Sequence, residues 1–160
     1  MAKLNIVKMG DDTLRRVCRP VEKITPRTVT LLDDMIQTMR EADGCGLAAP
    51  QVGVLRRIAL VEVEPGKLYE LINPESIARE GTQNELEGCL SLPGQWGITE
   101  RPEKVTVRAM DRNGEIYEVS GEGLMARALC HELDHLDGVL YKDNAIHMLT
   151  KEEIKEQFED

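Results

Sequence analysis

The chain has 160 residues, of which 41% are hydrophobic and 31% charged, a composition that supports one globular domain over residues 1–160. Its formal charge of -9 disfavours nucleic acid and anionic membranes as partners. No apolar run approaches a membrane span or follows Met1 as a leader would, and four scattered cysteines fit a reducing cytoplasm.

The first predicted element is a helix that begins after Thr25. Thr25 is a suitable N-cap, Pro26 suits the first turn, and Gly44 lies just past the expected end. Apolar residues at helical spacing form one stripe, which predicts a surface helix packed on the core. The stripe consists of Val29, Leu32, Met35, Ile36 and Met39.

The middle of the chain predicts antiparallel β-strands. Residues 105–109 alternate apolar and polar side chains and Met110 follows them, and Asn113-Gly114 offers a hairpin turn into a strand at residues 116–119. The earlier strand candidates are residues 58–63 and 68–72, joined through Pro65-Gly66.

Near residue 131 the sequence places two histidines and a glutamate at the spacing of a metal site. Four residues of α-helix turn through about 400°, so His131 and His135 stand almost above one another, about 6 Å apart along the axis. Both rings can then reach one ion at about 2.0–2.1 Å. Glu132 lies about 100° round the helix, where its carboxylate can handle the protons of a water molecule. The HExxH spacing therefore predicts a catalytic metal site.

Apolar residues surround this HExxH segment on most sides, which predicts a buried central helix. Buried imidazole and carboxylate groups need partners, and a metal ion supplies one. Gly138 follows as a C-terminal stop. The apolar residues are Leu124, Met125, Ala128, Leu129, Cys130, Leu133 and Leu136.

A catalytic site of this kind needs a third protein ligand and one open position. The metzincin pattern fails, because Tyr141 stands where its last histidine would be. His147 is a further imidazole without supporting context. A thermolysin-like site would take a glutamate from the final segment, where the candidates are Glu152, Glu153 and Glu156.

Cys89 is another candidate for the third ligand. It lies in residues 87–91, which are polar and contain a glycine, so we expect a loop there that lets a thiolate approach an ion. Pro93-Gly94 and Trp96-Gly97 predict that the loop continues. One cysteine with two histidines is a known catalytic ligand set.

Three segments resemble, in order and spacing, the three signature motifs of the peptide deformylases. They are GCGLAAPQ at residues 44–51, EGCLS at residues 87–91 and HELDH at residues 131–135. The likeness covers nearly the whole chain. The strand and helix patterns and this resemblance agree on an α+β fold, with antiparallel β-sheets around a central metal-binding HExxH helix.

The resemblance implies a role for each residue of these motifs. Glu132 would be the general acid/base, while the side-chain amide of Gln51 and the backbone N–H of Leu90 would receive the developing oxyanion. The metal ligands would be Cys89, His131 and His135. The residues that flank the substrate would be Gly44, Cys45, Gly46, Leu47, Glu87 and Gly88.

The activity that the resemblance implies is removal of the N-formyl group from the formyl-methionine of a newly made polypeptide, with release of formate. A metal-bound hydroxide would attack the formyl carbon, and Glu132 would pass its proton to the leaving amine. The family points to Fe²⁺ in the cell, with Zn²⁺, Ni²⁺ or Co²⁺ as substitutes in purified protein. The expected partners are formyl-methionyl peptides and, transiently, the ribosome, in the cytoplasm.

The chain departs from the family pattern at Cys45 and in its final residues, and one expected ion pair rests on analogy with the family. Cys45 replaces a common aliphatic residue and should pack like one, and Asp43 is expected by analogy to pair with Arg101. The final residues 151–160 form a short acidic segment, unlike a basic ribosome-docking tail.

Two alternative functions remain open. One is a zincin-like peptidase with a C-terminal glutamate ligand, and the other is a purely structural metal module.

Overall fold

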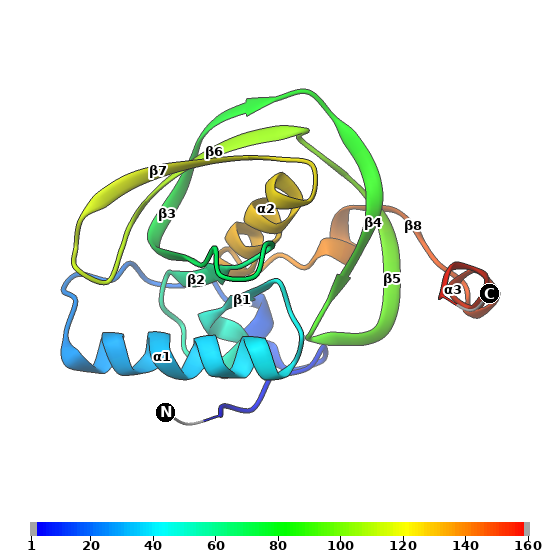
Figure 1. The fold of residues 1–160 in the computed structure, drawn as a ribbon. Helices are drawn as coiled ribbons and strands as arrows, with labels where there is room; N and C mark the ends of the chain where they lie inside the picture. Colours follow the sequence, from blue (N-terminus) through cyan, green and yellow to red (C-terminus); the bar gives the residue numbers. More distant parts are fainter. Residues whose placement is uncertain (1–2, 159–160) are drawn as a thin grey trace.

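The computed structural model describes residues 3–158, whose strands form two antiparallel sheets that curve around one helix (Figure 1). The larger sheet has the order β1-β2-β3-β6-β7 and the smaller one the order β4-β5-β8. The predicted α+β class with antiparallel sheets is confirmed. The strands are β1 (Gly46–Ala48), β2 (Ile58–Val61), β3 (Tyr69–Glu80), β4 (Gln83–Cys89), β5 (Leu92–Arg101), β6 (Lys104–Met110), β7 (Ile116–Glu122) and β8 (Ala145–Met148).

Helix α1 (Pro26–Glu41) is the surface helix that the first apolar stripe predicts. Thr25 is its N-cap, and the backbone N–H of Thr25 donates to the hydroxyl of Thr28 at 3.2 Å. Val29 is only half-buried, but the rest of the stripe packs into a core cluster with strand residues such as Leu47 and Ile58. The buried stripe residues are Leu32, Met35, Ile36 and Met39.

The β6–β7 hairpin follows the prediction from Asn113-Gly114, with Met110 opposite Ile116. Strand β3 is longer than the predicted residues 68–72. Its second half is mostly exposed, so apolar alternation could not reveal it. Pairing with β6 extends the strand instead.

The loop expected around Cys89 is wrong. Residues up to Cys89 belong to β4, and β5 begins at Leu92, so the segment is a hairpin with a tight turn. Glu87 pairs with Gly97, while Cys89 pairs with Leu92, because β5 carries extra residues between these two pairs. Cross-strand pairing therefore holds a glycine-containing segment extended where its composition favoured a loop.

Helix α2 (Leu124–Leu136) passes through the middle of the molecule (Figure 1) and packs against strands of both sheets. It ends two residues before Gly138, the predicted C-terminal stop, whose φ of 74° is left-handed. Leu124, at the start of α2, is 57% exposed, whereas Ala126 and most of the residues after it are buried. A short helix, α3 (Lys151–Phe158), follows β8. Every helix in the described residues is too short or too polar to span a bilayer.

Candidate metal centre

Helix α2 and the end of strand β4 bring together three metal-ligating side chains, Cys89, His131 and His135. Their ligand atoms all lie within 4.8 Å of one another. His135 Nε2 is 3.3 Å from Cys89 Sγ and 3.2 Å from His131 Nε2. Tetrahedral ligands about 2.0–2.3 Å from one ion are themselves about 3.3–3.7 Å apart. The spacing of the three atoms therefore fits a single cation.

Buried polar atoms without hydrogen-bond partners also fit a metal and its water. Among the described residues, Glu132 Oε1 is such an atom, and Glu132 is only 4% exposed. His135 Nδ1 is also without a partner, but it is the ring nitrogen that does not face Cys89, because Nε2 lies 3.3 Å from that sulfur. Burial raises the pKa of Glu132 to about 7, although His131 opposes the shift. A carboxyl group with that pKa can exchange a proton near neutral pH.

Glu87 orients one of the candidate ligands. Its Oε2 lies 2.5 Å from His131 Nδ1, which leaves the Nε2 of that ring directed toward Cys89 and His135. Carboxylates commonly fix the tautomer and orientation of metal-binding histidines in this way. Burial would raise the pKa of Glu87, but hydrogen bonds from His131 and Arg101 lower it well below its ordinary value.

Two buried arginines hold Glu87 in place. Arg101 donates to both carboxylate oxygens, at 3.1 and 2.7 Å, and to Asp134 at 2.6 Å. Arg127 of α2 donates to Glu87 Oε1 at 2.8 Å and is 3% exposed. The expected pair between Asp43 and Arg101 is wrong, because Glu87 and Asp134 take the guanidinium.

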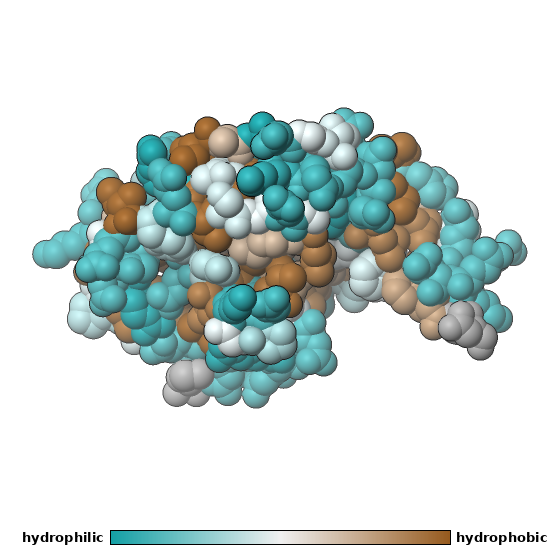
Figure 2. All heavy atoms as spheres, turned by 45° about the horizontal axis from the view of Figure 1, so that its top comes forward, coloured by the Kyte–Doolittle hydropathy of each residue, from teal (hydrophilic) through white to brown (hydrophobic). Residues whose placement is uncertain are grey.

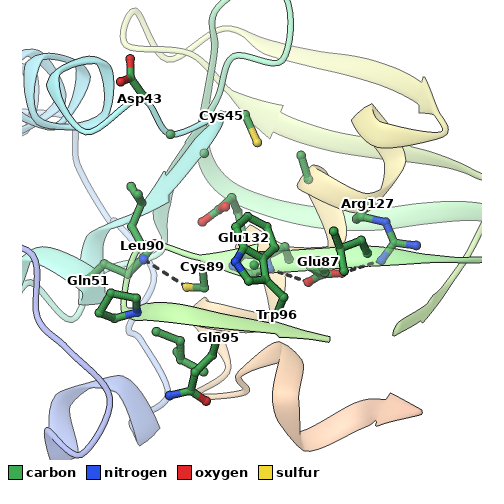
Figure 3. Close-up of a pocket in the computed structure, with 18 of the residues that line it drawn as sticks. Asp43, Cys45, Gln51, Glu87, Cys89, Leu90, Gln95, Trp96, Arg127 and Glu132 are labelled. Atoms are coloured by element: carbon green, nitrogen blue, oxygen red, sulfur yellow. Dashed lines mark hydrogen bonds and ion pairs between the residues drawn. The ribbon is translucent and has the colours of Figure 1, made fainter. Parts of the chain in front are cut away.

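Gln51 lies in a 3-10 turn, η2 (Ala49–Val52), that follows β1. Its Oε1 accepts the backbone N–H of Ala48 at 2.9 Å, which fixes the orientation of the amide. Its Nε2 donates to Ser91 Oγ at 3.0 Å and lies 3.6 Å from Cys89 Sγ. The amide N–H group is thus placed beside the sulfur of Cys89 (Figure 3).

The GCGLAAPQ segment forms one wall of a pocket of about 400 Å³ (Figure 3). A Cβ on Gly46 would overlap the carboxylate of Glu132 and lie 2.9 Å from its Cδ, so this glycine gives Glu132 its space. The expectation that Cys45 packs like an aliphatic residue is wrong, because the residue is exposed. Its thiol nevertheless lines the pocket, where desolvation by the surrounding protein atoms and the charge of Glu132 raise its pKa.

Most of the expected site residues line this one pocket. Figure 2 shows hydrophobic atoms at a hollow in the middle of the face that it views. Of the residues expected at the site, Leu47 and His135 are absent from the lining, since both are buried beneath it. The expected residues in the lining are Gly44, Cys45, Gly46, Gln51, Glu87, Gly88, Cys89, Leu90, His131 and Glu132.

The alternative third ligands are not brought to the histidine pair. Glu153 pairs with His147 at 2.8 Å on the exposed side of β8. Glu152 and Glu156 are exposed residues of α3. In residues 3–158 the side chains that could hold a metal gather only at Cys89 and the two histidines.

Sequence reasoning missed Arg127 and Thr99. Thr99 donates to Glu87 at 2.6 Å and contacts Arg127. The sequence could have identified Arg127, because a charged residue inside the apolar stretch 124–130 is rarely buried without a partner. Thr99 carried none, because its role depends on cross-strand pairing.

Comparison with known proteins gives a consistent result. The family model described as Polypeptide deformylase matches residues 3–151. The chain is 52% identical over 155 residues to the peptide deformylase of Caldanaerobacter subterraneus subsp. tengcongensis, covering 97% of each chain. It is 53% identical over 157 residues to that of Thermoanaerobacter pseudethanolicus, covering 98% of each. The crystal structure of peptide deformylase from Thermotoga maritima matches with a TM-score of 0.87 at 38% identity, covering 91% of this chain and 99% of that one.

Proposed function

This chain belongs to the polypeptide deformylase family, whose members are enzymes that hydrolyse N-formyl-methionine amides, and we propose that the cluster of one sulfur and two imidazoles is its catalytic metal site. The resemblance predicted from the three motifs is confirmed. The chain is accordingly a metal-dependent enzyme that removes the formyl group from newly made polypeptides. The observation that carries the proposed site is the convergence of three ligand atoms beside a buried, unpartnered oxygen of Glu132.

Cys89, His131 and His135 would hold the ion. When bound, a divalent ion supplies Lewis acidity, which lowers the pKa of water toward neutrality. We propose Fe²⁺ in the cell on the family resemblance, and the same mixed thiolate and imidazole set also accepts Zn²⁺, Ni²⁺ or Co²⁺.

Glu132 is the proposed general acid/base. It takes the proton that the attacking water loses and delivers it to the amine that leaves when the C–N bond breaks. The pKa of about 7 supports this role, because the carboxyl group can hold the proton between the two transfers. The space that Gly46 leaves for the carboxylate keeps it in reach of the site.

Gln51 and the backbone N–H of Leu90 are the proposed donors to the oxyanion that develops on the formyl oxygen. The hydrogen bond from Ala48 preorganises the Gln51 amide, whose Nε2 lies 3.6 Å from the sulfur of Cys89. One such donor in a site that excludes water contributes about 2.7–4 kcal/mol to transition-state stabilisation.

The peptide is proposed to lie between β1 and β4. Each is an end strand of its sheet, and both contribute to the pocket wall. An extended peptide can therefore hydrogen-bond to either edge as an added strand. The walls are formed by Gly44, Cys45 and Gly46 on one side and by Glu87 and Gly88 on the other. The apolar residues Leu90, Leu124 and Ala128 are available to the methionine side chain.

The test is formate release from formyl-Met-Ala by anaerobically loaded Fe²⁺ enzyme. Glu132→Gln should lower kcat about 10²- to 10⁴-fold, because it removes the general acid/base. Glu152→Gln, a matched change at an exposed position of α3, should keep the parent rate. Parent-like turnover by Glu132→Gln would refute the role of Glu132.

The ligand set has a separate test in metal content. Cys89→Ser should weaken metal binding sharply, whereas Glu153→Gln should not. The opposite pattern would favour a peptidase-like site with a C-terminal glutamate. The pairing of Glu153 with His147 on the exposed side of β8 argues against that alternative.

The remaining parts of the proposal concern context. We propose that residues 1–160 act as a single catalytic domain, in line with the family match over residues 3–151. Because the substrate is a newly made polypeptide, the proposed place of action is the cytoplasm, with transient contact to the ribosome.

A further inference from the structure

Trp96 is the single tryptophan of the chain, and it lies directly against strand β4. A Cβ placed on Gly88 would lie 2.5 Å from Trp96 Cζ3 and 2.7 Å from its Cε3, so the indole ring covers this glycine. Gly88 precedes Cys89, and both Gly88 and Trp96 line the substrate pocket (Figure 3). The ring therefore forms part of the pocket wall beside the proposed metal site.

The C-terminal helix α3 contacts this ring. The rings of Trp96 and Phe158 have their centroids 4.9 Å apart at an interplanar angle of 43°, within the range of favourable aromatic pairs. Phe158 remains 52% exposed, and α3 has no buried residue. The contact with Trp96 thus joins the far end of α3 to the wall of the pocket.

The near end of α3 is attached independently. The backbone N–H of Leu149 donates to the carbonyl of Trp96 at 2.8 Å. Thr150 and Glu153 exchange hydrogen bonds at 2.9 and 3.2 Å, and Glu153 pairs with His147 of β8. Loss of the Phe158 ring would therefore leave the start of the helix in place.

Strand β4 separates α2 from α3. Glu87 reaches His131 of α2, while Gly88 faces the Trp96 ring. Successive residues of a strand point to opposite faces, which explains these two contacts. Figure 1 places α2 and α3 on opposite sides of the β4–β5 hairpin.

A peptide that adds to the edge of β4 alternates in the same way. If its methionine side chain points toward α2, the next side chain points toward the face that carries Trp96 and α3. We propose that Phe158 is a positioning residue, which holds the Trp96 ring over Gly88 so that the ring binds the side chain of the second substrate residue. The inference rests on the proposed function and adds the C-terminal helix to the elements that set substrate preference.

The experiment compares formyl-Met-Leu-Ser with formyl-Met-Gly-Ser on the metal-loaded enzyme. The parent should have a KM about threefold to tenfold lower for the leucine peptide, because an apolar side chain gains contact with the indole. Phe158→Ala should reduce this ratio below about twofold while kcat for both peptides stays unchanged. Phe158→Tyr keeps an aromatic ring and should restore the ratio. Gln157→Ala, at the neighbouring exposed position, should leave it unaltered.

The single tryptophan gives a second readout that does not depend on turnover. The product peptide Met-Leu-Ser should change the indole fluorescence of the parent enzyme, and Phe158→Ala should reduce that change. Equal KM ratios in the parent and Phe158→Ala would overturn this inference and leave the proposed function standing. No formate from the parent with either peptide would overturn both.

Discussion

Glu87→Gln is the most informative single change, because Glu87 joins the metal site to two buried arginines. The substitution keeps the shape of the side chain and removes its charge. Arg101 and Arg127, which are 8% and 3% exposed, would then share one neutral acceptor. Removing one partner from a buried ion pair costs about 3–5 kcal/mol, because a charge is left uncompensated. Asp134 still pairs with Arg101, so we expect the lower end, about 3 kcal/mol, in the free energy of unfolding.

The same change should weaken metal binding. Loss of the carboxylate that orients a metal-binding histidine typically costs 10- to 100-fold in affinity, so about that loss is expected for Zn²⁺. Urea denaturation of the metal-free protein measures the first effect, and competition with a chelator measures the second.

Arg127→Met is the matched control. It removes a neighbour of Glu87 but leaves the contact between Glu87 and His131, at 2.5 Å, and the pairing with Arg101. We expect a stability loss of about 1.5–3 kcal/mol from the lost charged hydrogen bonds, with metal affinity retained within about twofold. Equal losses of metal affinity in both variants would refute the idea that Glu87 acts through His131.

Three further predictions concern Gly46, the proposed metal ligands and the exposed thiol of Cys45. Gly46→Ala should lower kcat for formate release about 10²-fold with metal content unchanged, because the added Cβ displaces Glu132; an unaltered kcat would contradict the tight fit. Saturation with Zn²⁺ at about 100 times its Kd should raise the free energy of unfolding by about 2.7 kcal/mol, and Cys89→Ser should lose most of this gain in a urea titration. In the metal-loaded protein, iodoacetamide should label Cys45 first but slowly, since its pKa is raised while Cys18 and Cys130 are buried; mass spectrometry that finds another cysteine labelled first would refute this order.

Local spacing predicted the parts of the molecule that depend on local geometry. The histidine pair needs only the pitch of one helix, and the β6–β7 turn needs only two residues with suitable backbone preferences. The helix from Thr25 was predictable for the same reason, since its cap, first-turn proline and apolar stripe lie in one segment.

Contacts between distant segments were not predictable in this way. The partner of Arg101 depends on how the β4–β5 hairpin meets α2, and nothing near Arg101 or Asp43 in sequence encodes that meeting. The contact of Phe158 with Trp96 joins residues that are far apart in the chain, so no local pattern encodes it. The third metal ligand was only partly predictable from the sequence. Residue chemistry offered several candidates, and the family resemblance selected Cys89 from them.

The loop predicted around Cys89 was wrong in a way that explains the site. Two residues of a strand advance about 6.6 Å, and four residues of a helix advance about 6 Å. Glu87 and Cys89 are two apart on β4, while His131 and His135 are four apart on α2. Glu87 contacts His131 at 2.5 Å, and Cys89 contacts His135 at 3.3 Å. The two-residue repeat of an extended strand thus matches the four-residue spacing of the histidines on the helix. Glu87 can therefore orient His131 while Cys89 completes the ligand set. A flexible loop would provide no such match, and the glycine between the two residues leaves the opposite face free for the indole of Trp96.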